Sequence, residues 1–298
     1  MKVLITGTTG QLGTALQTST PRGVEALYMS RKELDLGDPN ECRRVIEMHE
    51  PDWLLNAGAY TAVDQAESEP KKAMAINAGA PEAFAEALEK QGGKILQIST
   101  DFVFDGTQST PYKPDQKKKP IGVYGKSKAE GEDAILSKLN CNERGIILRT
   151  SWVLGPVGKN FALTMLKLHS IKDEIRVVAD QIGCPTSTHT LAEACWRIIT
   201  NNKNTRLPSI MHWSDAGAAS WYDVAIAIGE LGQELELIDR CAKVRPITTE
   251  EYPTPAKRPN YSLLDCYETR KTLEIEGIHW RQTLRKCLKE IKTNQLNH

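Results

Sequence analysis

Short runs of apolar and β-branched residues alternate with longer amphipathic stretches through the first half of the chain. The short runs predict buried strands at residues 3–6, 26–29, 53–56, 95–99 and 146–149. The longer stretches have helical periodicity and predict helices at residues 11–18, 39–49, 70–91 and 124–139. Alternating strands and helices are typical of an α/β fold with a doubly wound parallel sheet, which is the fold class we expect.

The alternation fades after about residue 153, where helices are predicted at residues 160–169, 190–200 and 220–231. The stretch 106–122 is rich in proline and lysine and predicts a surface loop, with the three lysines at 117–119 solvated.

The 298 residues suffice for two modest domains, or for one large α/β domain with an appendage. We expect an NADP-binding Rossmann domain over residues 1–153. A smaller, mainly substrate-binding domain would follow over 154–298, with some segments returning to the sheet.

Charge and composition exclude several classes of function. Lys plus Arg number 38 and Asp plus Glu number 38, so the net charge is zero, which argues against binding to nucleic acid. No apolar run approaches the roughly 20 residues that span a bilayer, and the N-terminus lacks the apolar core of a secretory signal. The seven cysteines are scattered without C-x-x-C spacing, which favours free thiols over a zinc or catalytic site. We therefore expect a cytoplasmic protein that does not contact a membrane.

A glycine motif directly follows the first predicted strand and opens the first predicted helix. Its sequence is Gly7-Thr8-Thr9-Gly10-Gln11-Leu12-Gly13. Glycines at these positions allow a tight turn, close approach of the backbone to a pyrophosphate, and close packing of helix on strand. The helix N-terminus adds free N–H groups for the phosphates. An ordinary strand–turn–helix is the alternative, but the position at the first strand–helix junction favours a dinucleotide site.

The ends of the second and third strands indicate which dinucleotide binds. Ser30 and Arg31 follow the second strand, and no acid stands there to accept a ribose 2′-hydroxyl, whereas an arginine accommodates a 2′-phosphate. NADPH is therefore the expected cofactor, with NADH as the alternative if Arg31 is merely a solvated surface residue. The small residues of Ala57-Gly58-Ala59 would let a flat cofactor pass over the sheet edge.

The fourth predicted helix carries a candidate catalytic pair. Tyr124 and Lys128 stand at i and i+4, so both side chains project from one face. A nearby ammonium favours a phenolate, and we expect Lys128 to lower the pKa of Tyr124 for proton donation. The preceding strand ends in Ser99-Thr100-Asp101, which supplies a hydroxyl that could bind a substrate carbonyl. An unrelated surface pair is the alternative for any isolated Y-x-x-x-K.

Taken together, these motifs resemble the extended short-chain dehydrogenases/reductases, and within them the reductases that act on dTDP-4-dehydrorhamnose. The resemblance covers essentially the whole chain. Besides the glycine motif and Tyr124-Gly125-x-x-Lys128, it rests on Asn56-Ala57-x-Ala59-Tyr60-Thr61-Ala62-Val63-Asp64, Ser99-Thr100-Asp101-Phe102-Val103-Phe104-Asp105-Gly106, Arg149-Thr150-Ser151-Trp152-Val153, Asn160-Phe161, Asp180-Gln181-x-Gly183-x-Pro185-Thr186, Trp221-Tyr222 and Pro253-Thr254-Pro255-Ala256-x-Arg258-Pro259.

The resemblance implies NADPH-dependent reduction of the C4 keto group of dTDP-4-dehydro-L-rhamnose to dTDP-L-rhamnose, for polysaccharide biosynthesis. Tyr124 would donate the proton, Lys128 would lower its pKa and hold the nicotinamide ribose, and Thr100 would orient the carbonyl. The expected cofactor-binding residues are Gly7, Gly10, Gln11, Leu12, Gly13, Ser30, Arg31, Asp35, Leu36, Ala57, Gly58, Ala59, Tyr60, Asn77, Ser99, Tyr124 and Lys128. The expected substrate-binding residues are Val63, Thr100, Asp101, Trp152, Asn160, Gln181 and Arg258, with a core tryptophan as the alternative for Trp152.

One departure concerns a metal. Some members that resemble this chain carry a glutamate two residues beyond the third glycine, which contributes to a Mg²⁺ site between two subunits. This chain has Ala15 there, and an alanine cannot ligate a hard cation. We therefore expect metal-independent activity and no dimer built on that site, while a homodimer of another kind stays open.

Other interpretations stay open as well. A nucleotide-sugar epimerase or dehydratase shares the fold and the Tyr/Lys pair but recycles a tightly held NAD, and Arg31 argues against it. A non-catalytic NADP-binding regulatory subunit, like that of methionine adenosyltransferase, also resembles this family; the intact Thr100, Tyr124 and Lys128 favour an enzyme. Reduction of another 4-keto-6-deoxy nucleotide sugar is not distinguished by the sequence.

Overall fold

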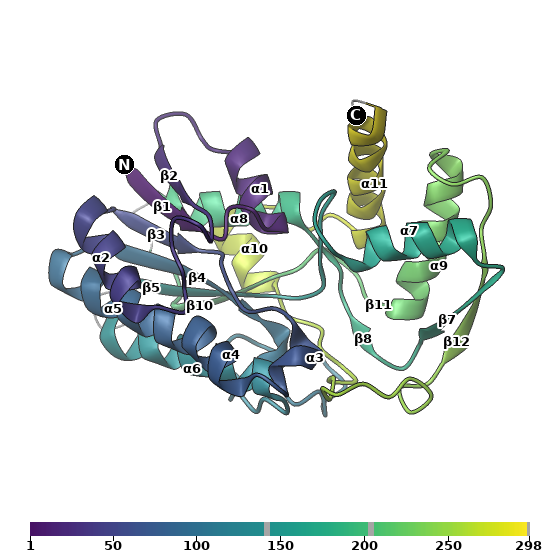
Figure 1. Cartoon of the computed structure of the whole chain (residues 1–298), viewed down its shortest axis with the longest axis horizontal. Coiled ribbons are helices and arrows are strands. Elements are labelled where there is room, and N and C mark those ends of the chain that lie inside the picture. The colour runs from purple at the N-terminus through teal and green to yellow at the C-terminus, as the bar shows by residue number, and fades with distance from the viewer. Residues whose placement is uncertain (140–143, 202–205, 297–298) are drawn as a thin grey trace.

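A six-stranded, all-parallel sheet lies at the centre of the first half of the molecule (Figure 1). The computed structural model describes residues 1–139, 144–201 and 206–296. In sheet order the strands are β2 (Glu25–Met29), β1 (Lys2–Thr6), β3 (Trp53–Asn56), β4 (Lys94–Thr100), β5 (Gly145–Thr150) and β10 (Ile210–Trp213). The strand order reverses between β1 and β3, and in such sheets ligands bind at the carboxyl ends of the strands near that point.

Helices cover both faces of this sheet. One face packs against α1 (Gln11–Thr18), α8 (Thr188–Ile199) and α10 (Tyr267–Leu273), and the other against α2 (Pro39–His49), α5 (Ala80–Gln91) and α6 (Val123–Leu139). Side chains alternate along β1 accordingly, because Val3 and Ile5 belong to the first core whereas Leu4 belongs to the second. Both faces of the sheet are therefore buried, as the apolar strand sequences predict.

The predicted helix over residues 70–91 is three successive pieces. They are α4 (Pro70–Met74), a π-helical turn η1 (Ala75–Gly79) and α5. The short helix α3 (Val63–Ala66) precedes them, and the 3₁₀ turn η2 (Asp101–Val103) follows β4. The π-turn is a local departure that often accompanies a functional site.

The second half has a core of its own, on the right of Figure 1. It contains α7 (Phe161–Ile171), α9 (Trp221–Glu234) and α11 (Trp280–Leu296), with β7 (Glu174–Val178) pairing in parallel with β12 (Lys243–Ile247). Two further pairs are β6 (Val153–Leu154) with β9 (Thr186–Ser187), and β8 (Ile182–Gly183) with β11 (Ala219–Ser220). This part packs beside the carboxyl ends of the sheet strands and forms one side of the site described below.

The structure confirms the five predicted strands and places helices between them, and besides the divided helix it differs in the following respects. The segment 26–29 is a half-exposed edge strand rather than a buried one, because it pairs only with β1. Strand β10 was not predicted; it comes from the second half and adds the sixth strand beside β5. Lys118 is not a solvated lysine, since its ammonium donates to the carbonyl of Ala129 at 2.8 Å. Within the described residues, no helix is long and apolar enough to cross a membrane.

Candidate active site

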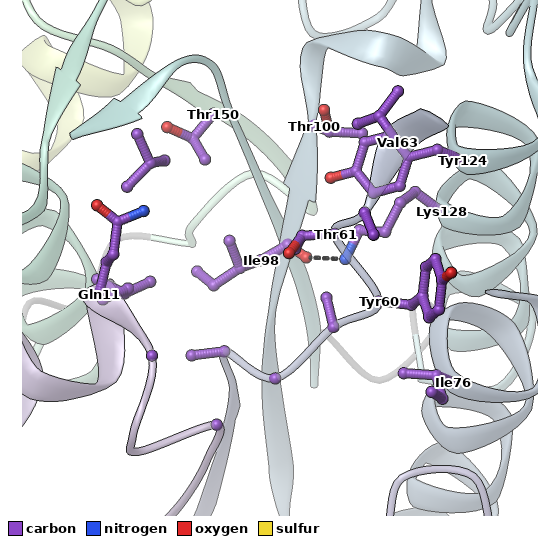
Figure 2. Close-up of a pocket in the computed structure, with 18 of the residues that line it drawn as sticks. Gln11, Tyr60, Thr61, Val63, Ile76, Ile98, Thr100, Tyr124, Lys128 and Thr150 are labelled. Carbon is purple, nitrogen blue, oxygen red and sulfur yellow. Dashed lines mark hydrogen bonds between the residues drawn. The ribbon is translucent and has the colours of Figure 1, made fainter. Parts of the chain in front are cut away.

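A cleft of about 1000 Å³ runs along the carboxyl ends of the sheet strands, between the two halves of the molecule. Figure 2 shows Thr100, Tyr124 and Lys128 on one side of it and Gln11 on the other. The candidate residues that line it are Gly7, Gly10, Gln11, Leu12, Gly13, Arg31, Asp35, Leu36, Ala57, Gly58, Ala59, Tyr60, Val63, Ser99, Thr100, Asp101, Tyr124, Lys128, Trp152, Asn160 and Arg258. Ser30, Asn77 and Gln181 do not line the cleft.

The glycine turn after β1 is shaped by close backbone contacts. Gly7 has φ of +67°, and a Cβ there would lie 2.6 Å from the Cα of Gly58. A Cβ at Gly13 would lie 2.3 Å from the carbonyl oxygen of Gly7, so helix α1 could not pack on the turn. Both glycines are therefore required by the local structure itself.

Gly10 differs from its two neighbours in the motif. A Cβ there would meet the carbonyl oxygen of Gly7 at 3.2 Å and no other heavy atom of the described residues within 4 Å, and Gly10 lines the cleft. Gly10 is also the N-cap of α1, and as a glycine it has no side chain that could occupy the N–H groups of the first turn. The first N–H groups of α1 therefore face the cleft, and this cradle fits the diphosphate of a dinucleotide.

Beyond the tip of β2, Arg31 lines the cleft and is exposed. Ser30 is turned to its own chain, because its hydroxyl accepts from the backbone N–H of Lys32 at 3.2 Å. Asp35 also lines the cleft, and its carboxylate accepts from the N–H of Gly37 at 2.9 Å. Arg31 thus places a cationic side chain at this end of the cleft.

Asn77, in the π-turn, does not line the cleft but hydrogen-bonds to Tyr60, which does. Its buried amide accepts from the N–H of Tyr60 at 2.9 Å and donates to the carbonyl of Tyr60 at 3.0 Å. It also donates to the hydroxyl of Ser127, next to Lys128, at 3.0 Å. Asn77 therefore ties the segment after β3 to helix α6 rather than lining the cleft.

Lys128 and Tyr124 project from one face of α6 into the cleft. The ammonium of Lys128 donates to the carbonyl of Ile98 in β4 at 2.7 Å, the bond drawn dashed in Figure 2. Burial lowers the pKa of Lys128 to about 8, and the negative charge of Glu132 opposes this shift. The amine is consequently still mostly protonated at neutral pH.

The predicted net fall in the pKa of Tyr124 is wrong for this structure. Burial raises the pKa of Tyr124 to about 12 and the charge of Asp101 raises it further, whereas a hydrogen bond with Thr100 acts in the opposite direction. The physical reason is that desolvation of the phenolate dominates, and the ammonium of Lys128 is directed at a backbone carbonyl. Tyr124 therefore carries its proton throughout the neutral range.

Two buried polar atoms at the cleft lack partners among the described residues. They are Oδ2 of Asp101 and Oγ1 of Thr150. Burial raises the pKa of Asp101 to about 6, although hydrogen bonds from groups that include Thr100 lower it. A buried polar atom without a partner is costly, so Oγ1 of Thr150 fits a contact with a polar ligand, whereas the hydroxyl of Ser262 also acts on the carboxylate of Asp101.

An aromatic stack forms the wall contributed by the second half. The rings of Trp152 and Trp221 are 3.7 Å apart and inclined by 10°, and Phe161 packs on Trp221. Trp152 has φ of +46°, and a Cβ on Gly183 would come within 2.6 Å of its indole. Trp152 is thus held in a fixed orientation at the cleft. Trp221 was missed as an individual candidate, although the pattern Ser220-x-x-Asp223 of a capping box marks it as the first residue of a helix.

Two hydrogen-bonded pairs join the halves across the cleft. Gln11 accepts from the amide of Asn160 at 2.9 Å. Arg258 binds both carboxylate oxygens of Asp64, at 3.0 and 2.8 Å, and lowers the pKa of that carboxyl. Gln181 instead donates to Thr249 at 3.1 Å, away from the cleft.

The third glycine's neighbourhood offers no ligand set for a metal. Ala15 is buried in α1, and the described residues contain no cluster of three or more His, Cys, Asp or Glu side chains that could hold an ion.

A doubly wound sheet, a glycine turn after its first strand and a Tyr–Lys pair on the helix after its fourth are the architecture of the extended short-chain dehydrogenases/reductases. The structure of UDP-glucose 4-epimerase from Thermus thermophilus, 18% identical with a TM-score of 0.78, covering 98% of this chain and 99% of its own, shares this fold. The chain belongs to the family described as RmlD substrate binding domain, whose model matches residues 1–293.

Several relatives with higher sequence identity are named dTDP-4-dehydrorhamnose reductase. A dTDP-4-dehydrorhamnose reductase of Sinorhizobium fredii is 39% identical over 97% of each chain. The crystal structure of a dTDP-4-dehydrorhamnose reductase from Bacillus anthracis in complex with NADP is 33% identical, with a TM-score of 0.88, covering 97% of this chain and 99% of its own. A probable dTDP-4,6-dihydroxy-2-methyloxan-3-one 4-ketoreductase of Streptomyces antibioticus is 36% identical, over 98% of this chain and 96% of its own.

Proposed function

We propose that this protein reduces the C4 keto group of dTDP-4-dehydro-L-rhamnose to give dTDP-L-rhamnose, with NADPH as the reductant. The observation that carries the proposal is the convergence of Thr100, Tyr124 and Lys128 on one wall of the cleft, facing the glycine turn. The reductases named above, which the chain matches over nearly its whole length, support the choice of substrate.

The cofactor would lie along the carboxyl edge of the sheet. The turn at Gly7 and Gly10 and the N-terminus of α1 would hold its diphosphate, and Arg31 its 2′-phosphate. The segment Ala57-Gly58-Ala59 has no long side chain to obstruct the path toward Lys128. When bound, NADPH would supply a hydride to the carbonyl carbon.

The chain's own residues would supply the proton and stabilise the developing charge. The hydroxyl of Tyr124 donates its proton to the carbonyl oxygen as that oxygen becomes negative, and the hydroxyl of Thr100 donates a hydrogen bond to the same atom. Because burial keeps Tyr124 protonated, the proton stays on the phenol until an alkoxide accepts it. The positive charge of Lys128 on the same helix face stabilises the phenolate that remains.

The other substrate contacts belong to the same proposal. Val63, Asp101 and Trp152 would surround the sugar, and Trp152 offers an apolar face for a deoxysugar. Asn160 and Arg258 would approach the nucleotide end, and Gln181 would act there only through neighbouring residues.

We also propose a cytosolic location, where thiols stay reduced; the six described cysteines are free, and Cys141 lies outside the described residues.

The test is oxidation of NADPH with enzymatically generated dTDP-4-dehydro-L-rhamnose. Tyr124→Phe removes the proton donor and is expected to lower kcat by roughly 10²–10⁴-fold. Tyr267→Phe, at a tyrosine that is 67% exposed and outside the cleft, is the matched control and should retain the wild-type rate. A Tyr124→Phe enzyme with near-wild-type kcat contradicts the mechanism.

The Streptomyces relative makes a second sugar worth including in the assay. The activity in its name is also reduction of a 4-keto group on a dTDP sugar, so the same site geometry would serve. We expect kcat/KM to be higher for dTDP-4-dehydro-L-rhamnose than for that sugar. No turnover of either sugar, with a tightly held NADP, would favour the regulatory subunit instead.

A further inference from the structure

Helix α6 carries another polar side chain, that of Glu132, on the face that bears Tyr124 and Lys128. Glu132 stands one helical turn beyond Lys128, and its side chain is 0% exposed. It does not line the cleft, so it contacts neither substrate nor cofactor. Burying a carboxylate completely costs free energy unless the charge is paired and hydrogen-bonded.

Both oxygens of this carboxylate are engaged. Oε1 accepts from the hydroxyl of Ser99 at 2.5 Å and from Nε of Arg149 at 2.9 Å, and Oε2 accepts from Nη2 of Arg149 at 2.8 Å. The ammonium of Lys118 lies 3.4 Å from Oε2. Burial opposes ionisation of Glu132, but these partners, Arg149 first, outweigh it and lower its pKa, so the carboxylate stays negative.

We propose that Glu132 is a positioning residue for the catalytic site: its carboxylate anchors Ser99 at the end of β4 and keeps the side chain of Lys128 charged and directed at that strand. Three consecutive residues of β4 then meet one face of α6. Ile98 accepts from Lys128, Ser99 donates to Glu132, and Thr100 acts on the pKa of the Tyr124 phenol. The inference rests on the proposed function for the catalytic roles of Tyr124 and Lys128.

Glu132 acts on Lys128 through its negative charge as well as through the contacts of its side chain. Side chains at i and i+4 of a helix are neighbours, so a charge on Glu132 acts directly on Lys128. Burial alone lowers the pKa of Lys128, and Glu132 is the group that opposes this shift. Without it, the amine would lose its proton nearer neutral pH and would no longer stabilise a phenolate on Tyr124.

The other charged and titratable groups around the pair come from four elements. Asp101 follows β4, Arg149 lies on β5, and Lys118 lies in the loop before α6, where it also pairs with Asp133 of α6 at 2.7 Å. His212 of β10 contacts Arg149, and burial together with the Arg149 charge lowers its pKa to about 3, so it is neutral. Within this set Glu132 is the anion on the same helix face as Lys128.

The decisive experiment measures Lys128 directly, in the ligand-free full-length protein. The ¹³Cε resonance of Lys128 is assigned by its loss in Lys128→Arg and followed by NMR against pH. In Glu132→Gln the transition should fall by about one pH unit, a roughly tenfold easier deprotonation. Glu130→Gln removes the same charge from the exposed side of the same helix and should leave the transition in place. Glu132→Asp keeps the charge and should stay within about half a unit of wild type.

Turnover supplies the second measurement, since the high-pH limb of kcat/KM should move down by the same amount in Glu132→Gln alone. If Glu132→Gln does not fold because Arg149 is left unpaired, Glu132→Gln with Arg149→Met removes the cation as well and should show a smaller fall in the same direction. An unchanged Lys128 transition in a folded Glu132→Gln protein, or an equal fall in Glu130→Gln, overturns the proposal. Because the NMR titration uses no substrate, a fall there without any turnover of the keto sugar would count against the proposed function only.

Discussion

Burial has opposite effects on the two members of the Tyr124–Lys128 pair. It raises the pKa of the phenol to about 12 and lowers that of the amine to about 8. Below about pH 8 both groups carry their protons, and as the pH rises through about 8 the amine loses its charge while the phenol keeps its proton. The proposed mechanism needs a protonated phenol and a cation beside it, so we expect the amine to set the upper pH limit of activity.

Arg31 is the residue that we expect to set the choice between NADPH and NADH. Arg31→Ala should weaken NADPH binding about 10- to 100-fold, because a hydrogen bond to a charged group contributes about 1.5–3 kcal/mol, and should leave NADH binding unchanged. Affinities measured by fluorescence titration with both cofactors check this. Lys32→Ala, an adjacent exposed cation that does not line the cleft, is the control. Equal losses for NADPH and NADH in Arg31→Ala would remove the assignment of the 2′-phosphate.

Among the elements, those built from local signals are predictable from the sequence. Helices α1 and α2 begin and end at the predicted residues, because a glycine turn in one case and Asp38-Pro39 in the other mark their starts. Strand β10 is only four residues long and pairs with a strand some sixty residues earlier, so no local signal reveals it. The π-turn at Asn77 depends in the same way on contacts with Tyr60 and Ser127.

The residues of the candidate site also divide into those that local motifs predict and those that only tertiary contacts bring together. Motifs of a few adjacent residues identified Gly7 to Gly13 and the pair Tyr124 and Lys128, which contribute to the lining of the cleft. The sequence could not reveal the pairing of Glu132 with Arg149, or the stack of Trp152 on Trp221, because the partners come together only in the tertiary structure.

The turn between β1 and α1 allows ligand contact and packing to be separated by substitution. Gly10→Ala should keep the thermal unfolding midpoint close to wild type but raise the Kd for NADPH about tenfold, or about 1.4 kcal/mol, because Gly10 lines the cleft and its Cβ would meet only the carbonyl oxygen of Gly7 among the described residues. Gly13→Ala should destabilise the protein by roughly 1–3 kcal/mol, because its Cβ would strike the backbone of the turn.

Calorimetry and cofactor titration on both glycine variants check this pair of expectations. Gly79→Ala, where the nearest atom to a new Cβ is 3.9 Å away, is the control for a glycine-to-alanine change. If Gly10→Ala bound NADPH normally, the cradle would have to lie elsewhere.

Across the whole molecule, the two halves are joined at the cleft by polar contacts. Gln11 meets Asn160, and Asp64 meets Arg258 in a two-pronged ion pair. The arginine side chain is 25% exposed and the aspartate 41%, so the pair itself contributes only about 0–1 kcal/mol to stability. Its larger effect is to hold Arg258 at the rim of the site.

Arg258→Ala should therefore raise KM for the nucleotide sugar about tenfold or more while changing kcat little and the free energy of unfolding by less than about 1 kcal/mol. Steady-state kinetics and denaturant unfolding check this. Arg176→Ala breaks an exposed ion pair with Glu251 in the same half, outside the cleft, and should change neither kinetic constant. A loss confined to kcat would place Arg258 away from substrate binding.

Strand β10 has a consequence for how such a chain can be divided or recombined. The polypeptide leaves the sheet after β5, builds part of the second core, returns to lay β10 along β5, and leaves again. A fragment ending at residue 153 would expose the backbone of β5 along an open edge, a template for aggregation, and the remaining fragment would carry a strand with no sheet to join. The second half that forms one side of the cleft is thus not an exchangeable module: a change of substrate would have to come from substitutions within one interleaved chain, not from replacement of its second half.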